Sequence, residues 1–221
     1  MNVRESIFWI GHAAFYIKAK GTTIFIDPFK VGDGIKEKAD IMLITHPHFD
    51  HNSKADIDRV RKDSTRIIAP KNCLDGKEYR HLEVSMPGFR TKINDVEIEA
   101  VSAYNKSEER QKFHPKSENW VGYVISIDGT RIYHAGDTDL IPEMENIRDI
   151  DVALLPMGGT YTMAEEDAIN AAKKIGPKTV IPMHYKMVLG RERSDQLEKS
   201  VTGKLKNALI LKEVQEPMYS F

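Results

Sequence analysis

Four side chains that bind metals or move protons lie close together in the stretch ITHPHFDHN, residues 44–52. His46 and His48 are two residues apart, so in an extended backbone both project from one face and can share one cation. Asp50 and His51 follow, and a turn into the next segment can direct them to a second point nearby. Neutral imidazole and carboxylate are suitable ligands for zinc, iron or manganese. The loop therefore predicts a metal site.

The ordinary interpretation of a single loop histidine is a solvated side chain. Here three histidines and an aspartate stand at i, i+2, i+4 and i+5 directly after the apolar run IMLI, a spacing that favours metal binding. The chain has one cysteine, Cys73, which excludes both a structural all-cysteine site and an internal disulfide.

Composition narrows the class of protein. The 221 residues suffice for one sizeable domain with a buried core. A net charge of -1 argues against a nucleic-acid binder, which normally has a strongly basic face. No apolar run approaches a membrane helix of roughly 20 residues. The start MNVRESIFWIGH lacks the pattern of a signal peptide, so we expect a cytoplasmic protein that does not bind membranes.

Short apolar runs rich in β-branched and aromatic residues recur along the chain and predict strands. They are AFYIKA, TIFID, IMLIT, VEIEAVSA, YVISI, RIYHA, VALLP and TVIP. Helices are predicted over 53–62, 163–175 and 194–206. For the second of these, Thr162 and Glu165 match a capping box and Gly176 supplies the stop.

An internal similarity pairs FYIKAKGTTIF (15–25) with YVISIDGTRIY (123–133). Both segments read as hairpins that turn at Gly-Thr, and they run on to Asp27 and Asp137 respectively. Chance similarity of two hairpins is the alternative. Two related halves packed sheet against sheet would give a layered α/β sandwich, and no linker interrupts the chain. We therefore predict one domain spanning 1–221.

The sequence HPHFDH resembles the H-x-H-x-D-H motif of the metallo-β-lactamase superfamily. GHAAFYIKAKGTTIFIDPF is similar to the opening hairpin of the branch that contains ascorbate-6-phosphate lactonase-like and phospholipase-D-like members. HAGDT resembles the motif of the bridging aspartate and IPMHY that of the final histidine. The resemblance covers nearly the whole chain in the family's order, and it implies a four-layer αβ/βα sandwich.

The resemblance also implies a ligand set for two divalent metal ions. Zinc is the expected metal, with manganese and iron as alternatives. The implied ligands are His46 and His48 for the first ion, Asp50, His51 and His184 for the second, and Asp137 as a bridge.

One ligand of the first ion departs from the family pattern. Relatives usually place a histidine shortly after the strand that corresponds to VEIEAVSA, but this chain has Asn105 there. A neutral amide is a poor zinc ligand. His114, nine residues later, is the nearest replacement, with a solvated loop histidine as its alternative.

Three further residues are candidates around the metals. The resemblance implies that Asp27 orients the histidine loop by hydrogen bonding, although an aspartate before Pro28 also suits a plain turn. His12 is open between a substrate contact and a core histidine. Lys186, with neighbouring basic residues, could receive an anionic substrate group, although solvated charge is the default for such a loop.

The predicted reaction is hydrolysis of a lactone, ester or phosphodiester bond in a small molecule, because paired cations make hydroxide available near neutral pH. Asp50 is the candidate general base. Two alternatives are a catalytically silent metal-binding regulatory or interaction protein and an iron-dependent oxidase. No nucleic-acid partner is expected, and the sequence leaves a homo-oligomer open.

Overall fold

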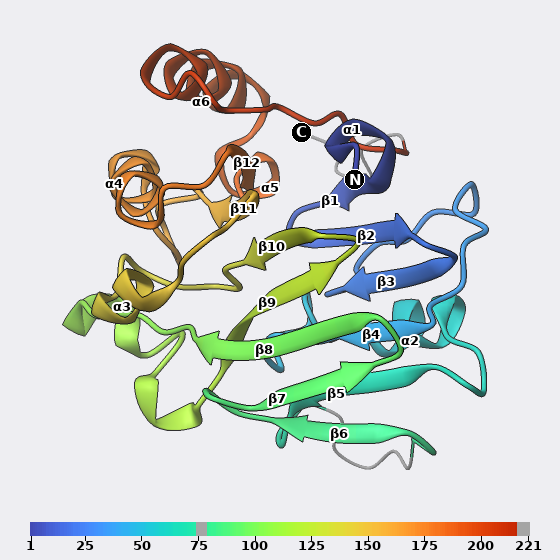
Figure 1. The fold of residues 1–221 in the computed structure, drawn as a ribbon. Helices are drawn as coiled ribbons and strands as arrows, with labels where there is room; N and C mark the ends of the chain where they lie inside the picture. The colour runs from blue at the N-terminus through green and yellow to red at the C-terminus, as the bar shows by residue number, and fades with distance from the viewer. Residues whose placement is uncertain (74–78, 216–221) are drawn as a thin grey trace.

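Two six-stranded mixed β-sheets form the centre of the molecule (Figure 1). The computed structural model describes residues 1–73 and 79–215. The first sheet contains, in spatial order, β1 (Ile7–Gly11), β2 (Ala14–Ala19), β3 (Thr22–Ile26), β4 (Ile41–Leu43), β5 (Arg66–Pro70) and β6 (Leu82–Ser85). The second contains β12 (Thr179–Met183), β11 (Val152–Pro156), β10 (Thr130–His134), β9 (Val121–Ile127), β8 (Val96–Ser102) and β7 (Arg90–Ile93).

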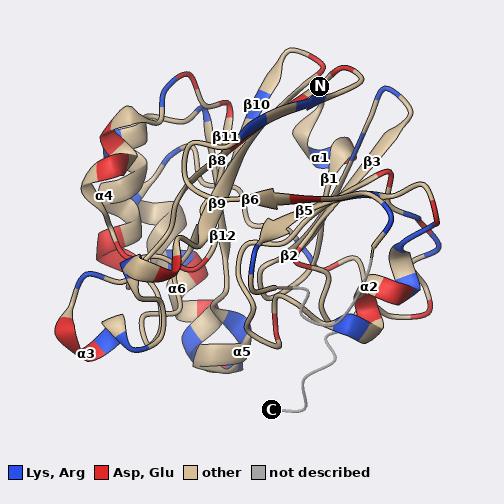
Figure 2. Cartoon of the chain, turned by 90° about the horizontal axis from the view of Figure 1, so that it is seen from below, with Lys and Arg blue, Asp and Glu red and all other residues tan. Residues whose placement is uncertain are grey.

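Helical segments connect the strands or cover them. The described helices are α1 (Val3–Ser6), α2 (Lys54–Val60), α3 (Glu108–Gln111), α4 (Glu165–Ile175), α5 (Lys186–Leu189) and α6 (Arg191–Lys204), with 3-10 turns η1 (Lys116–Glu118) and η2 (Pro142–Asn146). Figure 2 shows α4 and α6 on one side of the sheets and α2 on the other. None of the described helices is long and apolar enough to cross a membrane.

Side-chain alternation gives the first sheet two buried faces, because successive residues of a strand point to opposite sides. In β2, Phe15 and Ile17 join the core between the sheets, whereas Tyr16 packs in the outer core with Ile57 and Val60 of α2. On the second sheet, apolar residues of α4 join the main core and cover β11. The layers are therefore helix, sheet, sheet, helix, which confirms the predicted αβ/βα sandwich.

The repeated hairpins have equivalent positions in the two sheets. β2–β3 and β9–β10 are antiparallel pairs, and each is followed by two parallel strands, β4–β5 and β11–β12. The registers place the turns at residues 20–21 and 128–129, not at the predicted Gly-Thr. The first residue of each turn, Lys20 or Asp128, and its glycine have positive φ, as a two-residue hairpin turn requires. Threonine belongs to the following strand.

The predicted helices exist with shifted ends. α2 and α6 occupy the regions predicted at 53–62 and 194–206, and α4 ends at Gly176 as predicted, with a left-handed C-cap. The capping box at Thr162 is wrong. α4 begins at Glu165 after Ala164, and the Thr162 hydroxyl has no hydrogen-bond partner among the described residues.

Candidate metal centre

The predicted metal ligands come from both sheets and meet at one edge of the sandwich. They are contributed by the loop after β4 (His46, His48, Asp50, His51), the loop between β8 and β9 (His114), the end of β10 (Asp137) and the end of β12 (His184). Their ligand atoms, together with one from His12, form three overlapping groups in each of which the atoms lie within 4.8 Å of one another. The groups are His46, His48 and His114; His12, Asp50, His51 and His184; and His46, His51 and Asp137. Residues 138 positions apart in the chain therefore share one site.

The first group contains His46, His48 and His114. Thr45 Oγ1 donates to Asp27 Oδ2 at 2.6 Å and lies 2.9 Å from His46 Nδ1, which therefore carries the ring proton. His46 Nε2 is thus left with a lone pair, and it lies 3.1 Å from His48 Nδ1. A cation between these nitrogens would give both lone pairs a partner.

Asp137 lies between this group and the second, which contains His12, Asp50, His51 and His184. Its Oδ2 is 3.0 Å from His184 Nε2 and 3.4 Å from His114 Nε2, and its Oδ1 is 3.5 Å from His51 Nε2. The carboxylate therefore faces ligands of both groups, as a bridging ligand must.

Asp27 holds the histidine loop from beneath. Its carboxylate accepts hydrogen bonds from the Thr45 backbone N–H at 2.8 Å, the Thr45 hydroxyl and His51 Nδ1 at 2.8 Å. This leaves His51 Nε2 directed toward Asp137. Asp27 is fully buried and orients the loop instead of reaching the metal groups.

Asn105, the residue at the family's histidine position, supports His114. His114 Nδ1 donates to Asn105 Oδ1 at 2.8 Å, and Asn105 Nδ2 donates to the Tyr161 carbonyl at 3.0 Å and to Asp139 Oδ1 at 3.3 Å. Arg110 pairs with Asp139 at 3.2 Å. These contacts fix the ring so that Nε2 of His114 faces Asp137.

A metal fits this arrangement because buried polar atoms of the site otherwise have no partner. Within residues 1–73 and 79–215, no hydrogen-bond partner is found for the buried His51 Nε2, His114 Nε2, Asp137 Oδ1 and both ring nitrogens of His184. Each such atom costs free energy unless it finds a partner. Imidazole nitrogen and carboxylate oxygen are also the donors that zinc, iron and manganese accept.

Burial and charge set the protonation of the ligands. Burial lowers the pKa of His46 and lowers that of His114 to about 4, so both rings are neutral at pH 7 and able to bind a cation. Burial opposes ionisation of Asp137, yet the neighbouring His184 and His51 hold its pKa well below the usual range. Burial lowers the pKa of His51, but the nearby carboxylates of Asp137 and Asp27 outweigh this effect and raise the pKa well above its usual value.

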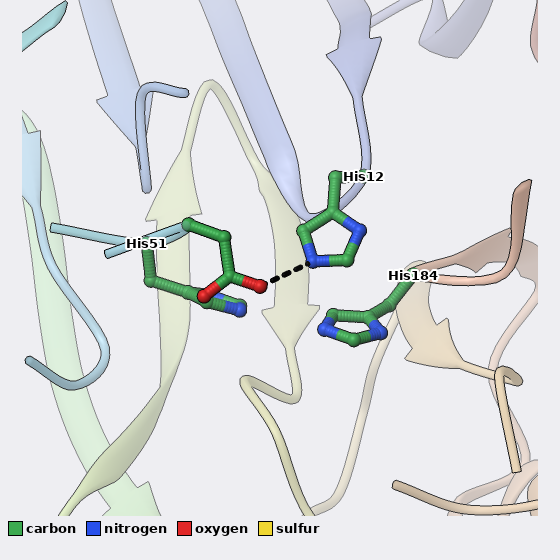
Figure 3. Close-up of side chains that lie close together, drawn as sticks. His12, His51 and His184 are labelled. Carbon is green, nitrogen blue, oxygen red and sulfur yellow. Dashed lines mark hydrogen bonds and ion pairs between the residues drawn. The ribbon is translucent and has the colours of Figure 1, made fainter. Parts of the chain in front are cut away.

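His12 contacts the ligands themselves. It is 1% exposed, its Nε2 lies 3.0 Å from Asp50 Oδ2, and its ring centroid lies 3.7 Å from that of His184 (Figure 3). The His184 backbone N–H donates to the His12 carbonyl at 3.0 Å, which joins the two sheets. Both residues have left-handed φ, at 51° and 56°. Such backbone persists where surrounding contacts fix it, often at functional sites.

Lys186 lies apart from the metal groups. Its Nζ is 3.6 Å from Glu198 Oε1 and stacks over the Trp9 ring at 4.8 Å. Neither Lys186 nor His12 is among the residues that line the cavity at the metal site. The contact of His12 and Lys186 with a substrate therefore stays a prediction.

That cavity has a volume of about 520 Å³, within the usual range for small-molecule sites. Five predicted metal ligands form its floor, namely His48, Asp50, His114, Asp137 and His184. Its other lining residues are Phe49, Phe113, Thr160, Tyr161, Met187 and Val188. The lining residues outside the predicted ligand set were not predicted from the sequence. The signal that could have indicated them is Phe49, an aromatic residue between two predicted ligands in HPHFDH, whose side chain is 75% exposed.

The fold and the cluster define a class of protein, a two-sheet sandwich with histidine and carboxylate ligands at one edge. A family model described as a β-lactamase superfamily domain matches residues 6–184. A UPF0173 metal-dependent hydrolase of Pyrococcus furiosus is 33% identical over 221 residues, covering 93% of this chain and 96% of the relative. A homologue from Thermococcus onnurineus with the same description is 32% identical and covers 92% of this chain and 95% of the relative.

Solved structures of metal-dependent hydrolases are also similar to this chain. A candidate metal-dependent hydrolase from Parabacteroides distasonis has a TM-score of 0.82 at 36% identity, covering 95% of this chain and 93% of that one. A metallo hydrolase from Ignicoccus hospitalis has a TM-score of 0.74 at 27% identity, covering 95% and 96%. The chain therefore belongs to the β-lactamase superfamily, and within it to a group of metal-dependent hydrolases.

Proposed function

We propose that the chain hydrolyses a lactone, ester or phosphodiester bond of a small molecule, using two divalent metal ions held at the edge of the sandwich. The single observation that carries this proposal is the position of Asp137, whose carboxylate lies within 3.5 Å of His114 of the first set and of His51 and His184 of the second. One carboxylate between two sets of nitrogen ligands suits a pair of cations.

The residues divide into two sets. His46, His48 and His114 would hold the first ion, and Asp50, His51 and His184 the second, with Asp137 shared. When bound, zinc or a similar metal would supply Lewis acidity, which makes water a nucleophile near neutral pH and stabilises negative charge that grows on the substrate.

Asp50 is the proposed general base. Burial raises the pKa of Asp50, but the hydrogen bond with His12 helps to lower it below its usual value. The carboxylate is therefore ionised at neutral pH. The same bond fixes Oδ2 and so holds the carboxylate in place, and Asp50 would both bind the second ion and accept a proton from the attacking water. Asp50 lines the cavity, so a bound substrate lies within its reach.

Asn105 and Asp27 would keep the ligand rings in place. Each accepts a hydrogen bond from the Nδ1 of one histidine, so that the Nε2 of the same ring faces the metal position. Partners of this kind set the tautomer and the orientation of metal-binding histidines.

The test is elemental analysis of the purified protein, followed by assays of zinc-, manganese- and iron-loaded samples with p-nitrophenyl esters, γ-lactones and bis(p-nitrophenyl) phosphate. We expect about two metal ions per chain and turnover of at least one substrate class. His48→Ala should lose about one metal equivalent and at least 100-fold in activity. Bound metal with no turnover on any substrate would indicate a binding protein, and oxygen uptake by the iron-loaded protein would indicate an oxidase.

A further inference from the structure

Outside the metal ligands, the cavity wall is apolar. Phe49, Phe113, Tyr161, Met187 and Val188 line it, and Thr160 is the remaining polar contributor. No lysine or arginine is among the described residues that line it. A substrate that enters this cavity therefore meets mainly carbon surface outside the predicted metal-binding floor, with the hydroxyl groups of Thr160 and Tyr161 as the polar exceptions.

The aromatic residues are also unusual in their exposure. Phe49 is 75% exposed and Tyr161 is 41% exposed, and both belong to the few large hydrophobic side chains that the described surface leaves open. The edge of the Phe113 ring meets Tyr161 at a centroid distance of 4.9 Å, and Phe49 packs in the same way on Phe29 at 5.9 Å. Exposed aromatic side chains gathered at a concave site mark binding of apolar groups.

Three cations that adjoin the lining residues or the site's hydrogen-bond network contact other groups. Lys186 pairs with Glu198 and stacks on Trp9, and Arg110 pairs with Asp139. The exposed Lys112 has its ammonium group 5.1 Å from the centroid of the Phe113 ring. A phosphodiester or a carboxylated substrate would therefore find no cationic side chain in the wall to receive its charge.

We propose that the site takes an uncharged ester or lactone whose acyl part carries a hydrophobic group, aliphatic or aromatic, that rests on Phe49, Phe113 and Tyr161. This substrate class deepens the hydrolysis proposed above and rests on it. In the step, the acyl C–O bond breaks while the oxygen of water bonds to the carbonyl carbon. One proton of that water passes through Asp50 to the departing oxygen, so an ester gives a carboxylic acid and an alcohol, and a lactone gives one hydroxy acid.

The first arm of the test compares p-nitrophenyl esters with the metal-loaded full-length protein. From acetate to hexanoate we expect kcat/KM to rise roughly three- to fourfold per methylene group, the increment for burying one methylene. p-Nitrophenyl pentanoate should exceed mono-p-nitrophenyl glutarate, which has the same length but ends in a carboxylate, by about tenfold or more. Faster turnover of bis(p-nitrophenyl) phosphate, or of the glutarate, would overturn the proposed substrate class.

The second arm measures binding without turnover. Affinities of 2-butanone, 2-hexanone and 2-octanone are measured by saturation-transfer NMR or calorimetry with the same protein, and we expect tighter binding with each added methylene. If this series binds as expected but no ester or lactone is hydrolysed, the cavity's preference stands and the hydrolase proposal fails. If esters are hydrolysed without dependence on chain length, the hydrolase stands and the apolar substrate class fails.

Two variants locate the effect. Tyr161→Ala and Met187→Ala should each flatten the chain-length dependence and weaken 2-octanone binding by about tenfold for the tyrosine and less for the methionine. Tyr161→Phe keeps the ring and should behave as wild type. Met86→Ala removes a 56% exposed methionine that does not line this cavity, and it should leave both series unchanged. Unaltered chain-length dependence in Tyr161→Ala would overturn the assignment.

Discussion

Asn105 stands where the resemblance to the superfamily led us to expect a histidine, and its hydrogen bonds give it a different part in the site. Its amide oxygen accepts a hydrogen bond from His114 Nδ1, so Asn105 orients the ring of the predicted ligand, which stands nine residues further along the chain. The same amide is anchored through Asp139 and the Tyr161 carbonyl. An asparagine is suited to this role because it can accept from one group and donate to two others.

Asn105→Ala should weaken metal binding about 10- to 100-fold, the usual cost of losing a partner that orients a metal-binding histidine. Metal content by mass spectrometry and competition with a chelator measure the effect. His114→Ala should lose one metal equivalent altogether. Asn170→Ala, at an exposed position of α4, is the matched control. Wild-type affinity in Asn105→Ala would contradict the proposed role.

Asp27 supports two residues of the loop with one carboxylate. In Asp27→Asn the charge is lost, and an amide cannot accept equally well from the Thr45 hydroxyl, the Thr45 N–H and His51. We expect metal affinity to fall by a similar 10- to 100-fold. Asp33→Asn, whose side chain is 91% exposed, provides the comparison in the same chelator competition. Equal affinities of the two variants would show that Asp27 does not act through the loop.

The sequence indicated most of the candidate metal ligands, because HPHFDH places four of them in one loop. It did not indicate whether His114 reaches the site, because nothing local sets the path of the β8–β9 loop. That path depends on contacts with other segments, such as the Asn105 amide on Tyr161 and Arg110 on the Thr162 carbonyl.

The strands bring the ligands together through close backbone contacts. Gly136, which precedes the bridging Asp137, has φ +64°, and a Cβ there would meet the Val121 carbonyl at 2.7 Å and Thr45 Cβ at 3.3 Å. The glycine therefore permits the end of β10 to approach both the start of β9 and the metal-binding loop. Glycine is the residue that adopts this conformation without steric cost.

Gly136→Ala should lower the free energy of unfolding by more than about 1 kcal/mol, since the positive φ alone costs about that much and the contact adds to it. Urea unfolding measures the loss, and metal content should fall with it because Asp137 shifts. Gly203→Ala is the control, because no atom lies within 4 Å of a Cβ there and its φ is ordinary. In α6 this change should stabilise by about 0.5 kcal/mol. A Gly136→Ala protein as stable as wild type would refute the close approach.

At the level of strands and helices, sequence patterns were most reliable for buried strands. AFYIKA and VALLP coincide with β2 and β11, because their apolar content and flanking turns define them locally. The prediction did not include β1, β5, β6 or β7. β7, with the burial pattern of a half-exposed edge, is paired on one side by β8, so its sequence RTKI carries little apolar signal. α4 begins later than predicted because the segment before it connects to the Thr138 carbonyl and Gly159.

The buried charged groups of the predicted metal site come from both sheets of the molecule. We therefore expect metal binding and folding to be thermodynamically linked. At a free metal concentration about 100 times Kd, binding contributes about 2.7 kcal/mol to stability. For a chain of this size each kcal/mol shifts Tm by about 2–4 °C. Chelation should therefore lower Tm by about 5–10 °C, and added zinc should restore it.

Differential scanning calorimetry with and without chelator measures this shift. His184→Ala should show a smaller shift than wild type, because it removes a ligand of the second group. An identical Tm before and after chelation of the wild-type protein, with metal release verified, would contradict the linkage.

The predicted ligands divide between the sheets: His46, His48, Asp50 and His51 follow a strand of the first, whereas His114, Asp137 and His184 are attached to the second. Neither half of the chain possesses a full coordination shell. If the polypeptide is cut between β6 and β7, each fragment carries only part of the predicted ligand set. Zinc binding should then favour association of the two fragments. Ion uptake by the mixed fragments, absent from either alone, would then report complementation of the two halves.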